Sequence, residues 1–134
     1  MTTPAATPNL DKLSPEIRSL VQEYAFKYGI PAEFLATVII AESGGDPNSV
    51  NDTRGQTLPS GYSPEYSVGL IQLNLLGGQG GDYRGQPDWA LKEAAKKLLD
   101  PRANLDIGVP PIADAYQKAQ AKGETGQDLW DDVM

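Results

Sequence analysis

Glu42 is the residue of this sequence best placed to carry a proton. It follows an apolar run in "VIIAESGGDP" and stands before two glycines. On a helix it shares a face with Val38 and Phe34, so we expect that face to pack inward. Burial and the negative end of the helix dipole both disfavour the charged carboxylate and raise its pKa toward neutrality, as a general acid requires. The alternative is a frayed helix end with Glu42 in solvent.

The residue types that are absent narrow the chemistry further. The 134 residues include no histidine and no cysteine, which excludes Ser-His-Asp and Cys-His nucleophiles and disulfides. Acid–base chemistry near neutral pH therefore falls to a carboxyl, tyrosine or lysine with a shifted pKa. We expect no metal and no cofactor, because the acidic loop after Glu42 lacks the calcium-binding pattern. The net charge of -7 argues against nucleic-acid binding.

Helices are predicted on both sides of a polar centre and must position Glu42. Capping residues and apolar side chains at helical spacing place four of them, at about 14–29, 31–44, 87–99 and from 100 onward. Pro110 and Pro111 must kink or restart the fourth helix. A last helical stretch is predicted at 126–133. These elements indicate a predominantly α-helical domain.

The remaining segments are predicted to be loops, with little sheet. Residues 46–66 are rich in Asn, Asp, Gly, Pro and Ser and predict a long loop. "YSVGLIQL" (66–73) predicts a short strand or a buried turn, and residues 77–86 predict a mobile surface loop. Residues 1–13, rich in Thr, Pro and Ala, predict a flexible segment before one domain at 14–134. No apolar run approaches the ~20 residues that span a bilayer, and the start lacks a secretion signal.

Three blocks of the sequence form a pattern together with Glu42. They are "ESGGDPNSVN", "SPEYSVGLIQL" and "LLDPRANLDIG". In order and spacing they resemble the motifs of the lysozyme-like domain of soluble lytic transglycosylases, related to goose-type lysozyme. The resemblance covers about 14–122. It implies a lysozyme-like α+β fold in which a small irregular or β-containing region forms a glycan cleft.

The resemblance assigns roles to individual residues. Glu42 falls on the catalytic acid and Gln72 on a glutamine that contacts the sugar. Gly69 is expected to let the backbone approach the glycan, since it has no side chain to obstruct it. Tyr62, Tyr66 and Tyr83 lie in or near loops, where stacking on a sugar is plausible. The residues expected to bind substrate are Ser43, Ser63, Tyr66, Gly69, Gln72, Asn74 and Asn104.

The sequence departs from the family pattern at several places. Gly45 stands where an aromatic residue is usual. The separation of Glu42 and Gln72 is longer than usual, so the loop serine of the family falls on Asn51 or Ser63; we favour Ser63, because Ser63-Pro64 reproduces the local motif. The C-terminal Ala-Tyr-Asn-Ala-Gly motif does not appear, and "GETGQDLWDDV" resembles the tryptophan-containing ends of phage-borne relatives.

The resemblance implies cleavage of the β-1,4 bond between N-acetylmuramic acid and N-acetylglucosamine in peptidoglycan, giving 1,6-anhydro products. Two alternatives stay open. One is a hydrolytic lysozyme, with Glu65, or else Asp46 or Asp52, as a second carboxylate. The other is an inactive glycan-binding or structural domain of a phage tail protein. We expect action on the bacterial wall, in the periplasm or outside the cell, possible delivery as part of a virion, and no membrane span.

Overall fold

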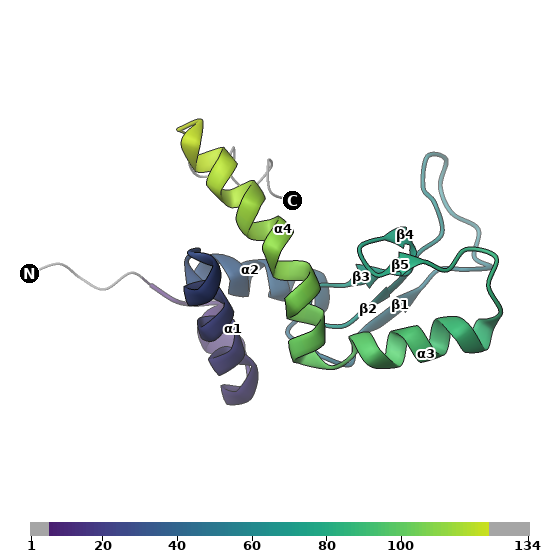
Figure 1. Ribbon diagram of the computed structural model, residues 1–134, viewed down its shortest axis with the longest axis horizontal. Helices are drawn as coiled ribbons and strands as arrows, with labels where there is room; N and C mark the ends of the chain where they lie inside the picture. The colour runs from purple at the N-terminus through teal and green to yellow at the C-terminus, as the bar shows by residue number, and fades with distance from the viewer. Residues whose placement is uncertain (1–5, 124–134) are drawn as a thin grey trace, which may run out of the picture.

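The computed structural model describes residues 6–123, which form helices and two small antiparallel sheets. The helices are η1 (Leu10–Lys12), α1 (Pro15–Tyr28), α2 (Ala32–Ser43), α3 (Asp88–Leu98) and α4 (Pro101–Ala121). The strands are β1 (Val50–Asp52), β2 (Tyr66–Val68), β3 (Leu73–Asn74), β4 (Leu76–Gly78) and β5 (Gly81–Asp82). Figure 1 shows α1, α2 and α4 towards one end and the two sheets beside α3 towards the other. The expected α+β class, mainly helical with a small β-containing region, is confirmed.

The first two helices begin and end where their local sequence predicts. The Ser14 hydroxyl accepts a hydrogen bond from the Ile17 amide and caps α1, which ends at Gly29 in the left-handed conformation. Gly44, with φ of +67°, ends α2 in the same way. Because a glycine adopts positive φ without a steric penalty, both helices stop sharply at these residues.

The last two helices also match the prediction, with one correction. Helix α3 lies within one residue of its predicted bounds, and the Asp100 side chain caps α4 by accepting from the Ala103 amide. Pro110 and Pro111 lie inside a single helix, so α4 does not restart there. Buried residues on both sides of the prolines, Val109 and Ala113, hold the helix against the core. The helix predicted at 126–133 lies outside the described residues.

The centre of the chain contains more sheet than expected. Strands β1, β2 and β3 form an antiparallel sheet in that order, with Val50 opposite Val68 and Ser67 opposite Asn74. The predicted loop at 46–66 therefore contains a strand. "YSVGLIQL" holds β2, a largely buried turn and the first residue of β3, so both expected forms are present. Residues 77–86, expected to be a mobile surface loop, include most of the β4–β5 hairpin.

The N-terminal segment belongs to the folded domain from about residue 9. Leu10 and Leu13 are buried in the core, and the backbone amides of Asn9 and Leu10 donate to the Glu33 carboxylate at 2.9 and 3.0 Å. The prediction of a flexible segment over the whole of 1–13 is thus wrong at its end, because Leu10 and Leu13 pack into the core. No helix in the described range is both long and apolar enough to cross a membrane.

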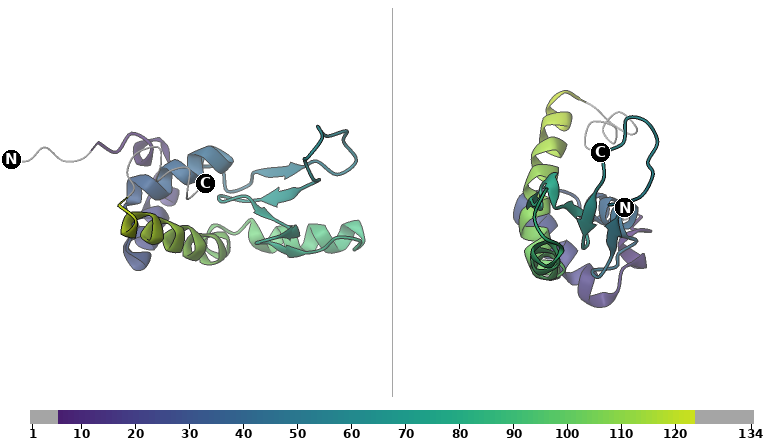
Figure 2. Two further views of the ribbon diagram at one scale, coloured as in Figure 1. Left: turned by 90° about the horizontal axis from the view of Figure 1, so that it is seen from above. Right: turned by 90° about the vertical axis from the view of Figure 1, so that its right-hand side faces the viewer.

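The elements divide into a helical end and a sheet end. Figure 2 shows α1, α2 and most of α4 at one end and the strands with α3 at the other. Leu70, Leu73 and Leu75, around the β2–β3 turn, are almost fully buried in the core that both ends share. Tyr24 and Tyr116 are buried as well. Most of the candidate site residues lie around the end of α2 and the sheet that follows it.

Asn104 of α4 joins the two ends through a fully buried amide. Its Oδ1 accepts from the Ile71 amide at 2.9 Å, and its Nδ2 donates to the carbonyls of Val68 and Leu98 at 2.9 and 2.8 Å. Gly69, with φ of +80°, leaves the space that this amide fills, since a Cβ there would collide with Nδ2. One side chain thereby satisfies three buried backbone groups.

Replacing Asn104 should lower stability strongly. Asn104→Ala leaves one amide and two carbonyls buried without partners, so we expect the free energy of unfolding to fall by about 3 kcal/mol. Chemical denaturation measures this change. Asn48→Ala, at an exposed position, is the matched control and should change stability by less than about 0.5 kcal/mol. Equal losses in both variants would contradict the role given to the Asn104 amide.

Candidate active site

Glu42 lies in the last turn of α2 with its side chain exposed to solvent. The expectation that it packs inward with Val38 is wrong. Val38 is 2% exposed, but α2 ends one residue after Glu42, and the chain turns away at Gly44 and Gly45. The buried part of this helix face therefore ends before position 42. The carboxyl is accessible to a large ligand.

The surroundings of the Glu42 carboxyl nevertheless raise its pKa. Nearby protein atoms displace water from the carboxyl, which is the larger cause, and the negative charge of Glu65 adds to it. The residue as a whole is exposed, but its carboxyl is partly desolvated. The surroundings of the carboxyl determine the pKa of Glu42. The predicted direction is confirmed, with Glu65 as a contributor that the helical pattern did not indicate.

The helix end beside Glu42 is held by Ser43. Its hydroxyl donates to the Ile39 carbonyl at 3.0 Å and accepts from the Gly45 amide at 3.2 Å. A Cβ on Gly45 would lie 2.9 Å from the Leu13 side chain. Leu13 therefore occupies the space of a side chain at position 45, which explains the glycine where the family pattern has an aromatic residue.

Glu65 precedes β2 and is fixed by hydrogen bonds to both carboxylate oxygens. Asn51 of β1 donates its side-chain N–H to Oε1 at 2.7 Å, and the Ser67 hydroxyl donates to Oε2 at 2.7 Å. The backbone amide of Glu65 donates to the Thr53 hydroxyl at 2.8 Å. Asn51, the alternative for the loop serine, thus orients Glu65, and the second carboxylate is held at a defined position near Glu42.

Ser63 lies two residues before Glu65 on the exposed β1–β2 loop. It lines a hollow of about 340 Å³ with Pro64, Leu76 and Arg84. A hollow of about 410 Å³ between α1 and the start of α4 is lined by residues such as Glu16 and Arg102 and by none of the expected site residues. Glu42 lines neither hollow. The hollow at Ser63 lies next to Glu65 along the chain.

Gln72 and Asn74 brace the backbone around the site. Gln72, at a φ of +55° that is unusual for a side-chain-bearing residue, donates its Nε2 to the carbonyls of Ser49 and Gly69 at 3.1 and 2.9 Å. The Oδ1 of Asn74 accepts from the amides of Tyr66 and Leu76. Both side chains are half-buried, so part of each still faces solvent.

Three expected glycan contacts are supporting residues. Tyr66 is 7% exposed, and the Arg54 guanidinium covers its ring with 4.6 Å between them. Gly69 and Asn104 are buried against each other. The structure corrects these three expectations, because family motifs give positions and do not show which way side chains point. In this chain Gly69 and Asn104 hold the β2–β3 turn from its buried side.

A repeated motif was missed in the sequence. "DTRGQ" (52–56) and "DYRGQ" (82–86) each begin at the last residue of a strand, and each arginine pairs with the aspartate two residues earlier. The repetition itself is the signal that could have identified them as matching turns. In the described range no cluster of acidic side chains could hold a metal ion.

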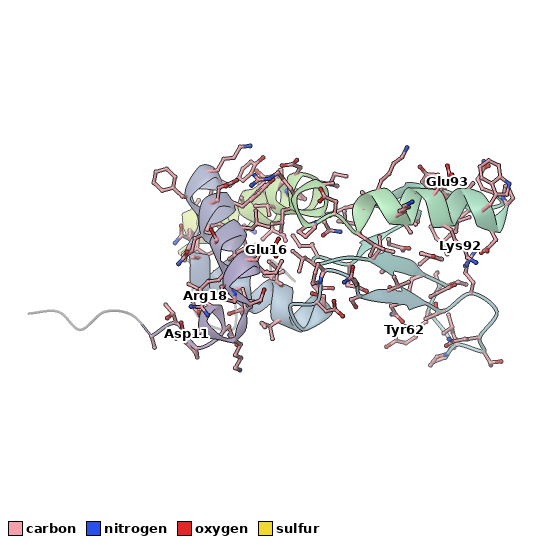
Figure 3. All side chains as sticks on the ribbon, turned by 90° about the horizontal axis from the view of Figure 1, so that it is seen from below. Asp11, Glu16, Arg18, Tyr62, Lys92 and Glu93 are labelled. Atoms are coloured by element: carbon pink, nitrogen blue, oxygen red, sulfur yellow. The ribbon has the colours of Figure 1, made fainter. Side chains whose placement is uncertain are left out.

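The pairing of Glu42 with Glu65 has a direct test. Replacing Glu65 by Gln removes a negative charge near Glu42, so the pKa of Glu42 should fall toward the ordinary glutamate value. A pH titration of the side-chain carboxyl carbons by NMR measures this pKa. Glu93→Gln, on the outer side of α3 (Figure 3), should leave it unchanged. The electrostatic link is disproved if both variants give the wild-type value.

Comparison with known protein families matches residues 19–130 to the transglycosylase SLT domain. Searches among curated proteins and among solved structures gave no match. The matched range contains all the expected site residues, and its last part, from residue 124, lies outside the described residues. Lytic cleavage of peptidoglycan is the activity that this family supports. The resemblance seen in the sequence is thereby confirmed, and the chain belongs to the transglycosylase SLT domain family.

Proposed function

We propose that this domain cleaves the β-1,4 bond between N-acetylmuramic acid and N-acetylglucosamine, with Glu42 as the general acid and base. The observation that carries the proposal is an exposed carboxyl with a raised pKa at the end of α2, within an SLT domain. Exposure lets a polymer reach the group. A raised pKa keeps more of it protonated near neutral pH, which is the form that donates a proton.

The reaction uses Glu42 twice. The protonated carboxyl gives its proton to the glycosidic oxygen, and the bond from that oxygen to C1 of the muramic residue breaks. The N-acetyl group of the substrate stabilises the positive charge at C1. The Glu42 carboxylate then takes the proton of the C6 hydroxyl, whose oxygen bonds to C1 and closes a 1,6-anhydro ring. Glu42 returns to its protonated form, and no water is consumed.

Two roles of Glu65 in this chemistry are compared. As a neighbouring negative charge it raises the pKa of Glu42 and so supports the acid step. As a base it could activate water, which is the hydrolytic alternative. A carboxylate accepts about four hydrogen bonds, so the bonds from Asn51 and Ser67 leave room for a water. We favour the first role, because the hydrogen bonds from Asn51 and Ser67 fix the position of the Glu65 carboxylate.

For the biological setting we make a less specific proposal than for the reaction. Action on peptidoglycan places the substrate in the bacterial wall, in the periplasm or outside the cell. The likeness of the C-terminal segment to phage-borne relatives supports a place within a larger phage tail or secretion-associated polypeptide. An inactive glycan-binding or structural domain in such a protein is the competing function.

Replacing the acid should abolish cleavage. Glu42→Gln keeps the size of the side chain and removes the transferable proton, so the rate should fall about 10²- to 10⁴-fold. The clearing of a purified peptidoglycan suspension measures this rate. Glu93→Gln carries the same change on the outer side of α3 and should retain the wild-type rate. If wild type and Glu42→Gln are equally inert, the domain is not the proposed enzyme.

The released products separate the two chemistries. Mass spectrometry of the muropeptides should show 1,6-anhydro ends, one water lighter than hydrolysed ends. Glu65→Gln should slow the reaction and leave the product unchanged, because its charge acts through Glu42. Hydrolysed products from the wild type that disappear in Glu65→Gln would instead assign Glu65 as the base of a lysozyme.

A further inference from the structure

The two D-x-R-G-Q turns have nearly identical local structures. In each, the arginine Nε and Nη2 donate to the two oxygens of the aspartate two residues earlier, at 2.8–2.9 Å for Arg54 and 2.7–2.8 Å for Arg84. The following glycines, Gly55 and Gly85, have the same φ of +79°. The aspartate thus holds one edge of the guanidinium and leaves the remaining N–H groups pointing away from the turn.

The two arginines differ in what meets those remaining N–H groups. The Nη2 of Arg54 donates a second bond to the Asp88 carboxylate at the start of α3, at 2.9 Å. Arg84 bonds to Asp82 alone among the described residues, and its side chain is 68% exposed. Arg54 therefore shows the ligand that this turn accepts at its second edge, namely a carboxylate.

The free edge of Arg84 lies at a formed hollow. Arg84 lines it with Ser63, Pro64 and Leu76, and its volume is about 340 Å³. The guanidinium rests on the backbone of Gly77, where a Cβ would lie 3.2 Å from its central carbon. Asp82 below and Gly77 beside it fix the cation, so little entropy is lost when a ligand binds.

The hollow is close to Glu65 along the chain. Ser63 and Pro64, which line it, directly precede Glu65. The hollow also contains part of the β1–β2 loop, which is longer here than the family pattern requires. Tyr62 of this loop is 72% exposed and points away from the sheet (Figure 3). A ligand bound at this hollow would, along the chain, lie beside Glu65, whose charge acts on Glu42.

We propose that the hollow at Arg84 binds a carboxylate of the peptide stem that hangs from the muramic residue. This inference rests on the proposed function. The stem is joined to the sugar through a lactyl group and ends in free carboxylates, so it supplies the required charge on a group that branches from the strand. In a chain of net charge -7, a cation held open at this place selects for an anion. The lactyl carboxylate of a strand without stems has the same chemistry.

Direct binding tests the hollow without relying on turnover. The probe is a disaccharide-tetrapeptide, titrated by calorimetry into Glu42→Gln protein. Adding Arg84→Gln should raise the dissociation constant about fivefold, a modest effect because the site is exposed, and added salt should reduce the difference. Arg102→Gln is the matched control, an exposed arginine paired with Glu23 at the other hollow, and should not change binding. Equal affinity in all three proteins would overturn the proposal.

Turnover on two substrates identifies the source of the carboxylate. Wild type and Arg84→Gln are compared on intact glycan strands and on strands whose stems an amidase has removed. The ratio of kcat/KM for intact over stripped strands should fall about fivefold in Arg84→Gln. A ratio that rises, because only the stripped strands are cleaved more weakly, would overturn the stem assignment in favour of the lactyl carboxylate, which is free only on strands without stems. An unchanged ratio would overturn both assignments. If Arg84→Gln weakens binding of the probe but no protein cleaves either strand, the proposed function fails and the binding site stands.

Discussion

The buried amide of Asn104 is the interaction on which the arrangement of the site depends. It fixes the backbone of the β2–β3 turn at Val68 and Ile71 while sitting on α4. That turn carries Gln72, whose amide in turn holds the carbonyl of Ser49, in the connection from α2 to β1. The end of α2 and the start of β2 are therefore set relative to each other by a chain of side-chain-to-backbone bonds. These bonds determine how far the Glu42 carboxyl lies from Glu65.

That separation has an electrostatic consequence in a protein without histidine. An exposed glutamate alone would be ionised near neutral pH and could not donate a proton. Here partial desolvation and the charge of Glu65 shift the pKa of Glu42 upward before any ligand arrives. A glycan strand covering the exposed carboxyl would displace more water and shift it further in the same direction. In the proposed mechanism exposure and acidity are thus compatible, because a bound glycan would complete the desolvation of the Glu42 carboxyl that the fold begins.

Most of the helical frame could be predicted because its signals are local. The Ser14 cap and the terminal glycines Gly29 and Gly44 act within one turn of their own helices. Strands of two or three residues show no detectable period, so β1 and the β4–β5 hairpin were taken for loops. The packing of Leu13 into the space at Gly45 joins residues far apart in sequence. Likewise, motif matching located Asn104 and Gly69 but could not show that they face each other inside the core.

The paired D-x-R-G-Q turns separate what local sequence decides from what the fold decides. Each stretch specifies an aspartate–arginine pair by itself, since the partners are two residues apart and a positive-φ glycine follows. The use of the second guanidinium edge depends on the neighbour that the fold supplies. At Arg54 the neighbour is Asp88, and the edge ties the sheet to α3. At Arg84 it is the glycine backbone of β4, which supports the cation and brings no charge to neutralise its second edge. The same turn is therefore a structural brace in one place and an anion receptor in the other.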